Sequence, residues 1–129
     1  MRALLVWAWH DDSGRKERKM EIRTVLVTAP DKDTGVSLAR SLVAERIVAC
    51  GNVVPDLVSV YRWEGEVHED PEVLLVLKTT AERMDALTRR VRELHPYDVP
   101  EVLALPVKEG AEEYMEWVVA ECREAKREG

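Results

Sequence analysis

The residues best suited to chemistry lie within one short segment, His-Pro-Tyr-Asp-Val-Pro-Glu at residues 95–101. Pro96 and Pro100 fix their own backbone and bias the residue before each of them away from helical geometry. The segment therefore holds an imidazole, a phenol and a carboxylate in a fixed relation, and the neutral imidazole of His95 suits copper and zinc. The plainer interpretation is a helix stop, with the imidazole at the negative end of the helix dipole.

The elements that position this segment follow from the periodicity of apolar residues. Strands are expected at residues 22–28, 50–63, 66–78 and 101–107, with helices within 31–48, 79–95 and 111–122. This order is that of an α+β, ferredoxin-like βαββαβ fold with an extra C-terminal helix. Pro55 and Pro106 belong on edge strands, which predicts an antiparallel sheet of order 4-1-3-2.

Local signals predict details of the long hairpin and of the helix that follows it. Glu64-Gly65 is expected to form the tight turn, because glycine accepts a positive φ. Asp70-Pro71 predicts a bulge or kink in the third strand. Thr79, followed three residues later by Glu82, predicts a capping box at the start of the next helix.

Composition limits the classes of function. The 129 residues are 46% hydrophobic and 34% charged, with a net charge of -6, which counts against nucleic-acid and anionic-membrane partners. No apolar run approaches the roughly 18 residues of a membrane span. Cys50 and Cys122 are far apart and in no metal-ligand spacing, which indicates a reduced, cytoplasmic protein, although one disulfide between them stays open.

The N-terminal residues differ in character from the rest of the chain. An apolar stretch ending at Trp9 is followed by acidic residues and then by a charged run up to Lys19. We expect residues 1–19 to be an extension, disordered in one interpretation, and residues 20–129 to be the folded domain. Alternatively, the segment around Trp7 forms a short strand that pairs with the main sheet.

The strands carry more apolar surface than the predicted helices can cover. Residues 25–27, 73–77 and 102–105 are apolar without alternation, so both faces of the sheet require burial. Each exposed Leu or Val forfeits roughly 1.5–3 kcal/mol of burial free energy. We therefore expect the open faces of several copies to meet in a homo-oligomer. The alternative is that the C-terminal helix and residues 1–19 cover this surface within one chain.

Taken in order and spacing, six segments of the chain resemble the CutA divalent-cation-tolerance family. They are Thr28-Ala29-Pro30, Ala49-Cys50, residues 59–65, residues 77–80, residues 95–101 and residues 114–117. The resemblance covers roughly residues 21–121 and implies a ferredoxin-like homotrimer packed through its sheets. It also implies similarity to PII-type signalling proteins, which bind small ligands in clefts between subunits, and a link to tolerance of copper and other divalent cations.

The resemblance carries over only part of a metal site. Ligation in some members is attributed to a cysteine at the end of the first strand and to a histidine pair before the Pro-Tyr. Those positions are Val27 and Leu94-His95 here, so only His95 is carried over. A copper or other divalent-cation shell would need Cys50, Cys122, a carboxylate or a second chain to complete it, and the simpler interpretation of both thiols is a small buried hydrophobe.

Other candidates surround this histidine. Lys78, Tyr97 and Glu101 are expected near one rim of the sheet, where the lysine and the glutamate either pair or line a cleft for a small anion. Tyr61 and Trp63 on the hairpin are expected to pack against a neighbouring subunit, because they offer flat apolar area.

Two functions follow from these residues, and an enzyme is not expected. The first is a cytosolic homotrimeric protein that binds divalent cations or a small ligand at clefts between subunits. The second is a PII-like signalling or scaffold module whose hairpin engages a partner protein. No Ser/His/Asp arrangement and no phosphate-cradling loop stand out in the sequence.

Overall fold

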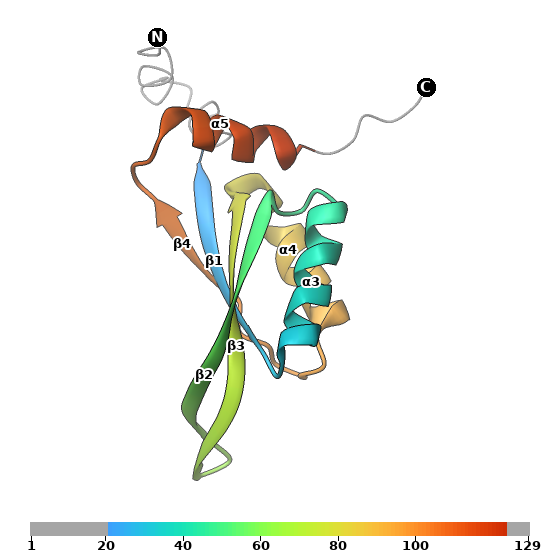
Figure 1. Cartoon of the computed structure of the whole chain (residues 1–129), viewed down its shortest axis with the longest axis vertical. Helices are drawn as coiled ribbons and strands as arrows, with labels where there is room; N and C mark the ends of the chain where they lie inside the picture. The colour runs from blue at the N-terminus through green and yellow to red at the C-terminus, as the bar shows by residue number, and fades with distance from the viewer. Residues whose placement is uncertain (1–20, 124–129) are drawn as a thin grey trace.

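A computed structural model describes residues 21–123, which form one four-stranded sheet with helices on one of its faces (Figure 1). The elements in chain order are β1 (Ile22–Ala29), α3 (Lys32–Ala44), β2 (Cys50–Trp63), β3 (Glu66–Thr80), the short 3₁₀ helix η1 (Ala81–Arg83), α4 (Met84–Leu94), β4 (Leu103–Val107) and α5 (Glu112–Glu121). The expected extension, residues 1–19, lies outside the described residues.

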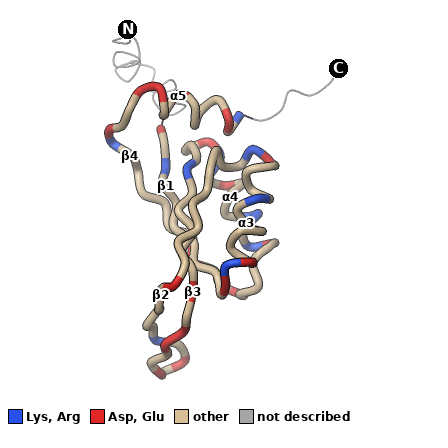
Figure 2. The backbone as a smooth tube through the Cα atoms, in the orientation of Figure 1, with Lys and Arg blue, Asp and Glu red and all other residues tan. Residues whose placement is uncertain are grey.

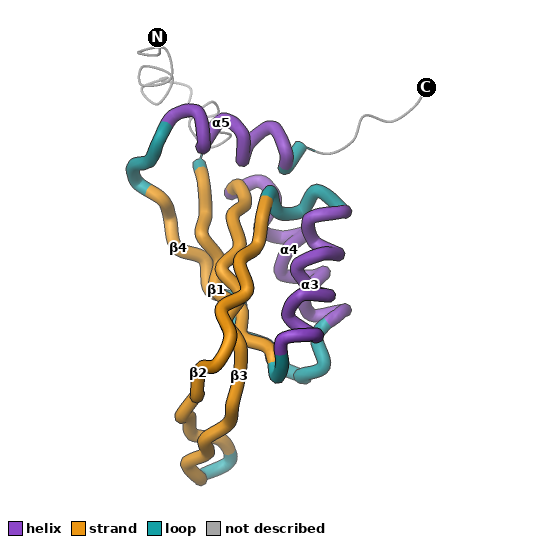
Figure 3. Tube along the Cα trace, in the orientation of Figure 1, coloured by secondary structure: helices purple, strands orange, loops and turns teal. Residues whose placement is uncertain are grey.

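The sheet has the order β2-β3-β1-β4, and all neighbouring strands are antiparallel. The prediction of a ferredoxin-like α+β fold with the order 4-1-3-2 is therefore confirmed. In Figure 3, α3 and α4 lie on the same side of the sheet, while β2 and β3 continue as a long hairpin well beyond both helices. No helix within residues 21–123 is long and apolar enough to cross a membrane.

The main core forms between the sheet and the two helices, because alternate strand residues point toward α3 and α4. Val25 and Val27 of β1 and Leu75 and Leu77 of β3 are fully buried there. Leu42 of α3 packs into the same cluster. Burial of each such side chain stabilises the fold by roughly 1.5–3 kcal/mol, so this layer fixes the strand register.

A smaller core anchors α5 across one end of the sheet (Figure 1). Met115 and Val118 of α5 and Cys122 are buried against Ile22 and Ala49. The helix therefore closes the end where β1 begins and leaves most of the open sheet face uncovered.

The hairpin begins to leave the sheet at a bulge in β2. The register with β3 shifts between Val54 and Leu57, and Asp56 adopts a φ of 62° there. The expected bulge at Asp70-Pro71 is wrong, because Pro71 pairs with Val58 in a continuous ladder. β1 has already ended at this point, so Pro71 sits where β3 has no neighbour on its other side and its missing N–H costs no ladder bond.

The hairpin ends in the tight turn that the sequence predicts. Glu64 and Gly65 have φ values of 51° and 83°, the two positive values of a type I′ turn. The expected capping box is wrong, since the cap of η1 is Thr80 and its side chain makes no capping bond. Thr79 is buried instead and donates its hydroxyl to the Ile47 carbonyl at 2.6 Å.

The sheet face turned away from α3 and α4 remains apolar and partly open. Leu26 of β1 pairs with Val76 of β3 and with Leu103 of β4, so the three side chains share this face. Leu103 and Leu105 are 58% and 50% exposed, and the partly exposed Leu74 continues the surface. The described part of the chain therefore leaves a contiguous apolar surface in contact with solvent.

Candidate functional site: an acidic, aromatic groove beside the hairpin

His95 lies just past the last residue of α4, where the chain turns from helix to extended backbone. It is 7% exposed, and its Nδ1 accepts the Tyr97 backbone N–H at 3.1 Å. Nε2 therefore carries the ring proton and donates it to the Thr28 carbonyl at 2.7 Å. Both ring nitrogens are used within the protomer, and the imidazole ties the loop after α4 to the end of β1.

Tyr97 is oriented by this histidine and in turn holds a buried carboxylate. Its ring centroid lies 4.7 Å from that of His95, and its hydroxyl donates to Glu72 Oε2 at 2.6 Å. Glu72 belongs to β3 and is only 9% exposed. Burial, followed by the hydrogen bond to this carboxylate, raises the pKa of the Tyr97 phenol well above its usual value.

A groove of about 690 Å³ opens beside this pair, and we call it the hairpin groove. Its lining comes from the end of β1, the hairpin strands and the loop after α4: Thr28, Ser59, Val60, Tyr61, Trp63, Glu72, Pro96, Tyr97, Asp98, Val99 and Glu101. Three of these are carboxylates, three are aromatic, and none is Lys, Arg or His. Burial, and then the nearby charge of Glu72, raise the pKa of the Glu101 carboxyl.

The distribution of charge along the chain agrees with this lining. In Figure 2, acidic residues predominate along the protruding half of the hairpin, whereas Lys and Arg gather on the helices. The hairpin groove thus lies on the acidic side of the fold, and its potential favours positively charged ligands.

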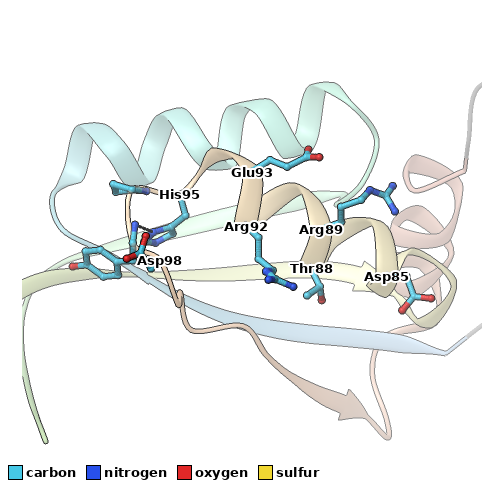
Figure 4. A pocket seen from close by; sticks show the side chains of 9 residues that line it. Asp85, Thr88, Arg89, Arg92, Glu93, His95 and Asp98 are labelled. Carbon is cyan, nitrogen blue, oxygen red and sulfur yellow. Dashed lines mark hydrogen bonds between the residues drawn. The ribbon is translucent and has the colours of Figure 1, made fainter. Parts of the chain in front are cut away.

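A second groove, of about 680 Å³, runs along α4 and ends at Asp98 (Figure 4). Arg92 and Thr88 extend from one side of the helix, whereas Arg89 and Glu93 extend from the other. Both acidic and basic side chains line it, in contrast to the hairpin groove, whose charged side chains are all acidic.

Lys78 and Cys50 lie apart from the hairpin groove. They pair with each other across β3 and β2, and Lys78 also pairs with Thr24, whereas Glu101 precedes β4 near the opposite end of β1. The expectation that Lys78 and Glu101 share one rim is therefore wrong, because the strand register separates them within the protomer. The role of Lys78 at a cleft between subunits stays a prediction.

The surroundings of Cys50 are nevertheless polar. The Lys78 ammonium donates a hydrogen bond to the Asn52 side-chain oxygen, and Cys50 Sγ lies 3.6 Å from the Tyr114 hydroxyl. Burial and the contact with this thiol raise the pKa of Tyr114 to about 12. Cys50 and Cys122 are both free thiols, and burial raises the pKa of Cys122.

Tyr61 and Trp63 project from β2 into the wall of the hairpin groove. Trp63 is 54% exposed, and Tyr61 stacks on His68 at 5.4 Å while donating its hydroxyl to Asp70. Their expected role in packing against a neighbouring subunit stays a prediction.

Of the residues singled out from the sequence, Tyr97, Glu101, Tyr61 and Trp63 meet at this groove. Glu72, which sequence reasoning missed, also lines it. The available signal was a carboxylate two residues before the apolar Leu74 and Val76 on the same strand face. Among residues 21–123, no group of three or more His, Cys, Asp or Glu side chains is arranged to hold a metal ion.

The fold and this site define a ferredoxin-like α+β protein whose sheet is closed at one end by a C-terminal helix and bordered by an acidic, aromatic groove. The family model for the CutA1 divalent ion tolerance protein matches residues 23–121. The chain therefore belongs to the CutA1 divalent ion tolerance family.

Individual relatives agree with this assignment. The divalent-cation tolerance protein CutA of Thermus thermophilus is 51% identical over 94 residues, which cover 73% of this chain and 91% of that protein. The chloroplastic protein CutA 1 of Oryza sativa is 50% identical over 101 residues, 78% of this chain and 57% of that protein.

Solved structures of relatives share the fold. The crystal structure of CutA1 from Oryza sativa superposes with a TM-score of 0.79 at 48% identity, covering 81% of this chain and 96% of that one. The divalent cation tolerance protein of Thermus thermophilus gives a TM-score of 0.74 at 49% identity, covering 75% and 94%.

Proposed function

We propose that this chain is a non-catalytic, homotrimeric divalent-cation tolerance protein that binds cations in grooves bordered by neighbouring subunits. The observation that carries the proposal is the buried Glu72 carboxylate in a groove lined by three acidic and no basic side chains. A buried negative charge favours a positive ligand, because desolvation is costly unless the charge is paired.

The apolar sheet face supports assembly. Glu72 and Thr28 of the hairpin groove point to the same face as Leu74 and Leu26, so the groove and the apolar surface are continuous. A second copy seated on that surface would border the groove. The number three rests on the resemblance to the CutA family.

Divalent metal ions are the first ligand class, and copper and zinc are its test cases. Carboxylate oxygens and imidazole are suitable ligands. No cluster of three such side chains exists in the described part of one protomer, so a complete shell requires a second subunit or water. His95 can ligate a metal only after releasing the Thr28 carbonyl or the Tyr97 N–H.

Calorimetric titration of copper(II) and zinc(II) tests this proposal. We expect saturable binding to the wild-type protein and weaker binding to Glu101→Gln, with Glu113→Gln on the exposed side of α5 as the matched charge control. Loss of binding in His95→Ala would assign the histidine a direct role. If Glu101→Gln and Glu113→Gln changed the heat of metal binding equally, a site in the groove would be contradicted.

A PII-like scaffold is the second candidate. It is favoured by the exposed apolar side chains of the hairpin, Val58, Val60 and Val67, which are 63–65% exposed. A partner that binds through the hairpin would be lost when these valines are changed to threonine while metal binding persists. The two free thiols support placement in a reducing compartment such as the cytoplasm.

A further inference from the structure

Glu72 is a buried carboxylate without a basic partner among residues 21–123. Its Oε2 accepts the Tyr97 hydroxyl at 2.6 Å, and no ion pair within residues 21–123 includes this carboxylate. The phenol is a neutral donor, so it supplies a hydrogen bond to one carboxylate oxygen but no positive charge. Buried carboxylates are normally paired with a cation, so Glu72 in the lining of the hairpin groove favours a positively charged ligand there.

The other ionisable side chains of the groove strengthen its preference for a positively charged ligand. Glu101 and Asp98 line the same space, and none of the residues between 21 and 123 that line it is Lys, Arg or His. The negative charge of Glu72 contributes to the raised pKa of Glu101, as expected of two carboxylates without a cation between them. An anionic ligand such as a nucleotide would meet three like charges, which disfavours that class.

The walls of the groove supply a second kind of recognition. Tyr61, Trp63 and Tyr97 all line it, and aromatic faces attract cations that lie within about 6 Å of the ring centroid. A hydrated metal ion makes little use of such rings, whereas an ammonium group with attached carbon uses both the rings and the carboxylates. The volume of about 690 Å³ accommodates a ligand of that size.

We infer that the hairpin groove binds organic ammonium ions, with Glu72 and Glu101 balancing the charge and Tyr61 and Trp63 contacting the apolar body. This rests on the proposal that the groove is the ligand site, and it adds the class of ligand. Free organic cations and hydrated metal ions compete for the same carboxylates, but only the former depend on the aromatic rings.

Choline and its uncharged carbon analogue 3,3-dimethyl-1-butanol provide a matched pair of probes. They are titrated into the full-length protein while the Trp63 indole N–H is followed by NMR. Choline is expected to shift this resonance saturably, and the neutral analogue to bind at least about fivefold more weakly. Trp63→Leu and Glu101→Gln are each expected to weaken choline binding severalfold, the former read from neighbouring amide resonances.

Two variants on α5 serve as controls, because that helix lies at the other end of the sheet. Trp117→Leu removes an exposed tryptophan and Glu113→Gln an exposed carboxylate, and neither should change choline binding. Equal affinity for choline and the neutral analogue would overturn the inference. So would the absence of any saturable shift up to about 50 mM, where even a millimolar Kd gives nearly full occupancy.

The same samples separate this inference from the proposed function. Copper or zinc binding without choline binding would overturn the organic-cation inference alone. The absence of both would remove the ligand site altogether. If the groove were filled by a lysine or arginine of a neighbouring subunit, choline would fail to bind the assembled protein, and that outcome also counts against the inference.

Discussion

The Tyr97 hydroxyl donates to Glu72 Oε2 at 2.6 Å and closes one side of a carboxylate that is 9% exposed. His95 fixes this relationship, because its Nδ1 accepts the Tyr97 backbone N–H and its Nε2 bonds the end of β1. The segment at residues 95–101 therefore positions the Tyr97 phenol against the buried Glu72 carboxylate.

Removing this phenol hydroxyl should destabilise the protein. Tyr97→Phe leaves a buried carboxylate without its donor, which we expect to cost about 1–3 kcal/mol in urea unfolding at constant protomer concentration. Tyr61→Phe is the control. Its acceptor Asp70 is exposed to water, so loss of this hydrogen bond should reduce the free energy of unfolding only slightly. Equal losses in the two variants would refute a special role for the Glu72 contact.

The raised pKa of Glu101 gives stability a defined pH dependence. The folded state holds this proton more tightly than the unfolded chain, so the favourable contribution is present below the ordinary carboxyl pKa and is lost as pH rises through the raised value. Glu101→Gln should therefore be more stable than wild type at pH 7, with the difference shrinking on acidification. Carboxyl ¹³C NMR should place the Glu101 midpoint above 4.5.

The apolar sheet face should control assembly. Leu105→Glu introduces a charge on that face, where the side chain is 50% exposed, and should dissociate the oligomer in sedimentation velocity experiments. Val43→Glu is the control, because Val43 is 40% exposed but lies on α3. An oligomer that tolerates Leu105→Glu would show that another surface joins the copies.

Arg46 offers a test of how α5 is held. Its φ of 61° lies in the left-handed region, while its guanidinium donates to the Ala120 carbonyl at 3.0 Å and the Arg123 carbonyl at 2.9 Å. Arg46→Ala removes both hydrogen bonds but still places a non-glycine residue at a positive φ, which is energetically unfavourable. Arg46→Gly removes the same bonds, but glycine adopts a positive φ without this strain. The glycine variant should be about 1 kcal/mol more stable than the alanine variant in thermal unfolding. The opposite order would contradict this account.

Much of the fold could be predicted from the sequence, because its signals are local. The apolar periodicity gave the limits of β2 as residues 50–63, and prolines at 55 and 106 placed two strands at the edges. The position of the bulge could not be predicted, because aspartate tolerates a positive φ, as at Asp56, but does not require one. Asp70-Pro71 carries the stronger sequence signal for an interrupted strand. Thr79 was misassigned because its hydroxyl bonds to Ile47, a partner 32 residues away.

The site was predictable only in part. Tyr97 and Glu101 follow from the rigid segment that contains them, but their relation to Lys78 depends on strand register, which a list of elements does not give. Glu72 was missed because its importance comes from burial beneath Tyr97, a contact between residues 25 positions apart.

Sedimentation equilibrium of the wild-type protein tests the central claim most directly, because grooves bordered by two subunits require assembly. The account predicts a single species of three times the protomer mass of 14.7 kDa across the micromolar range. A species of 14.7 kDa that binds no apolar dye would contradict it.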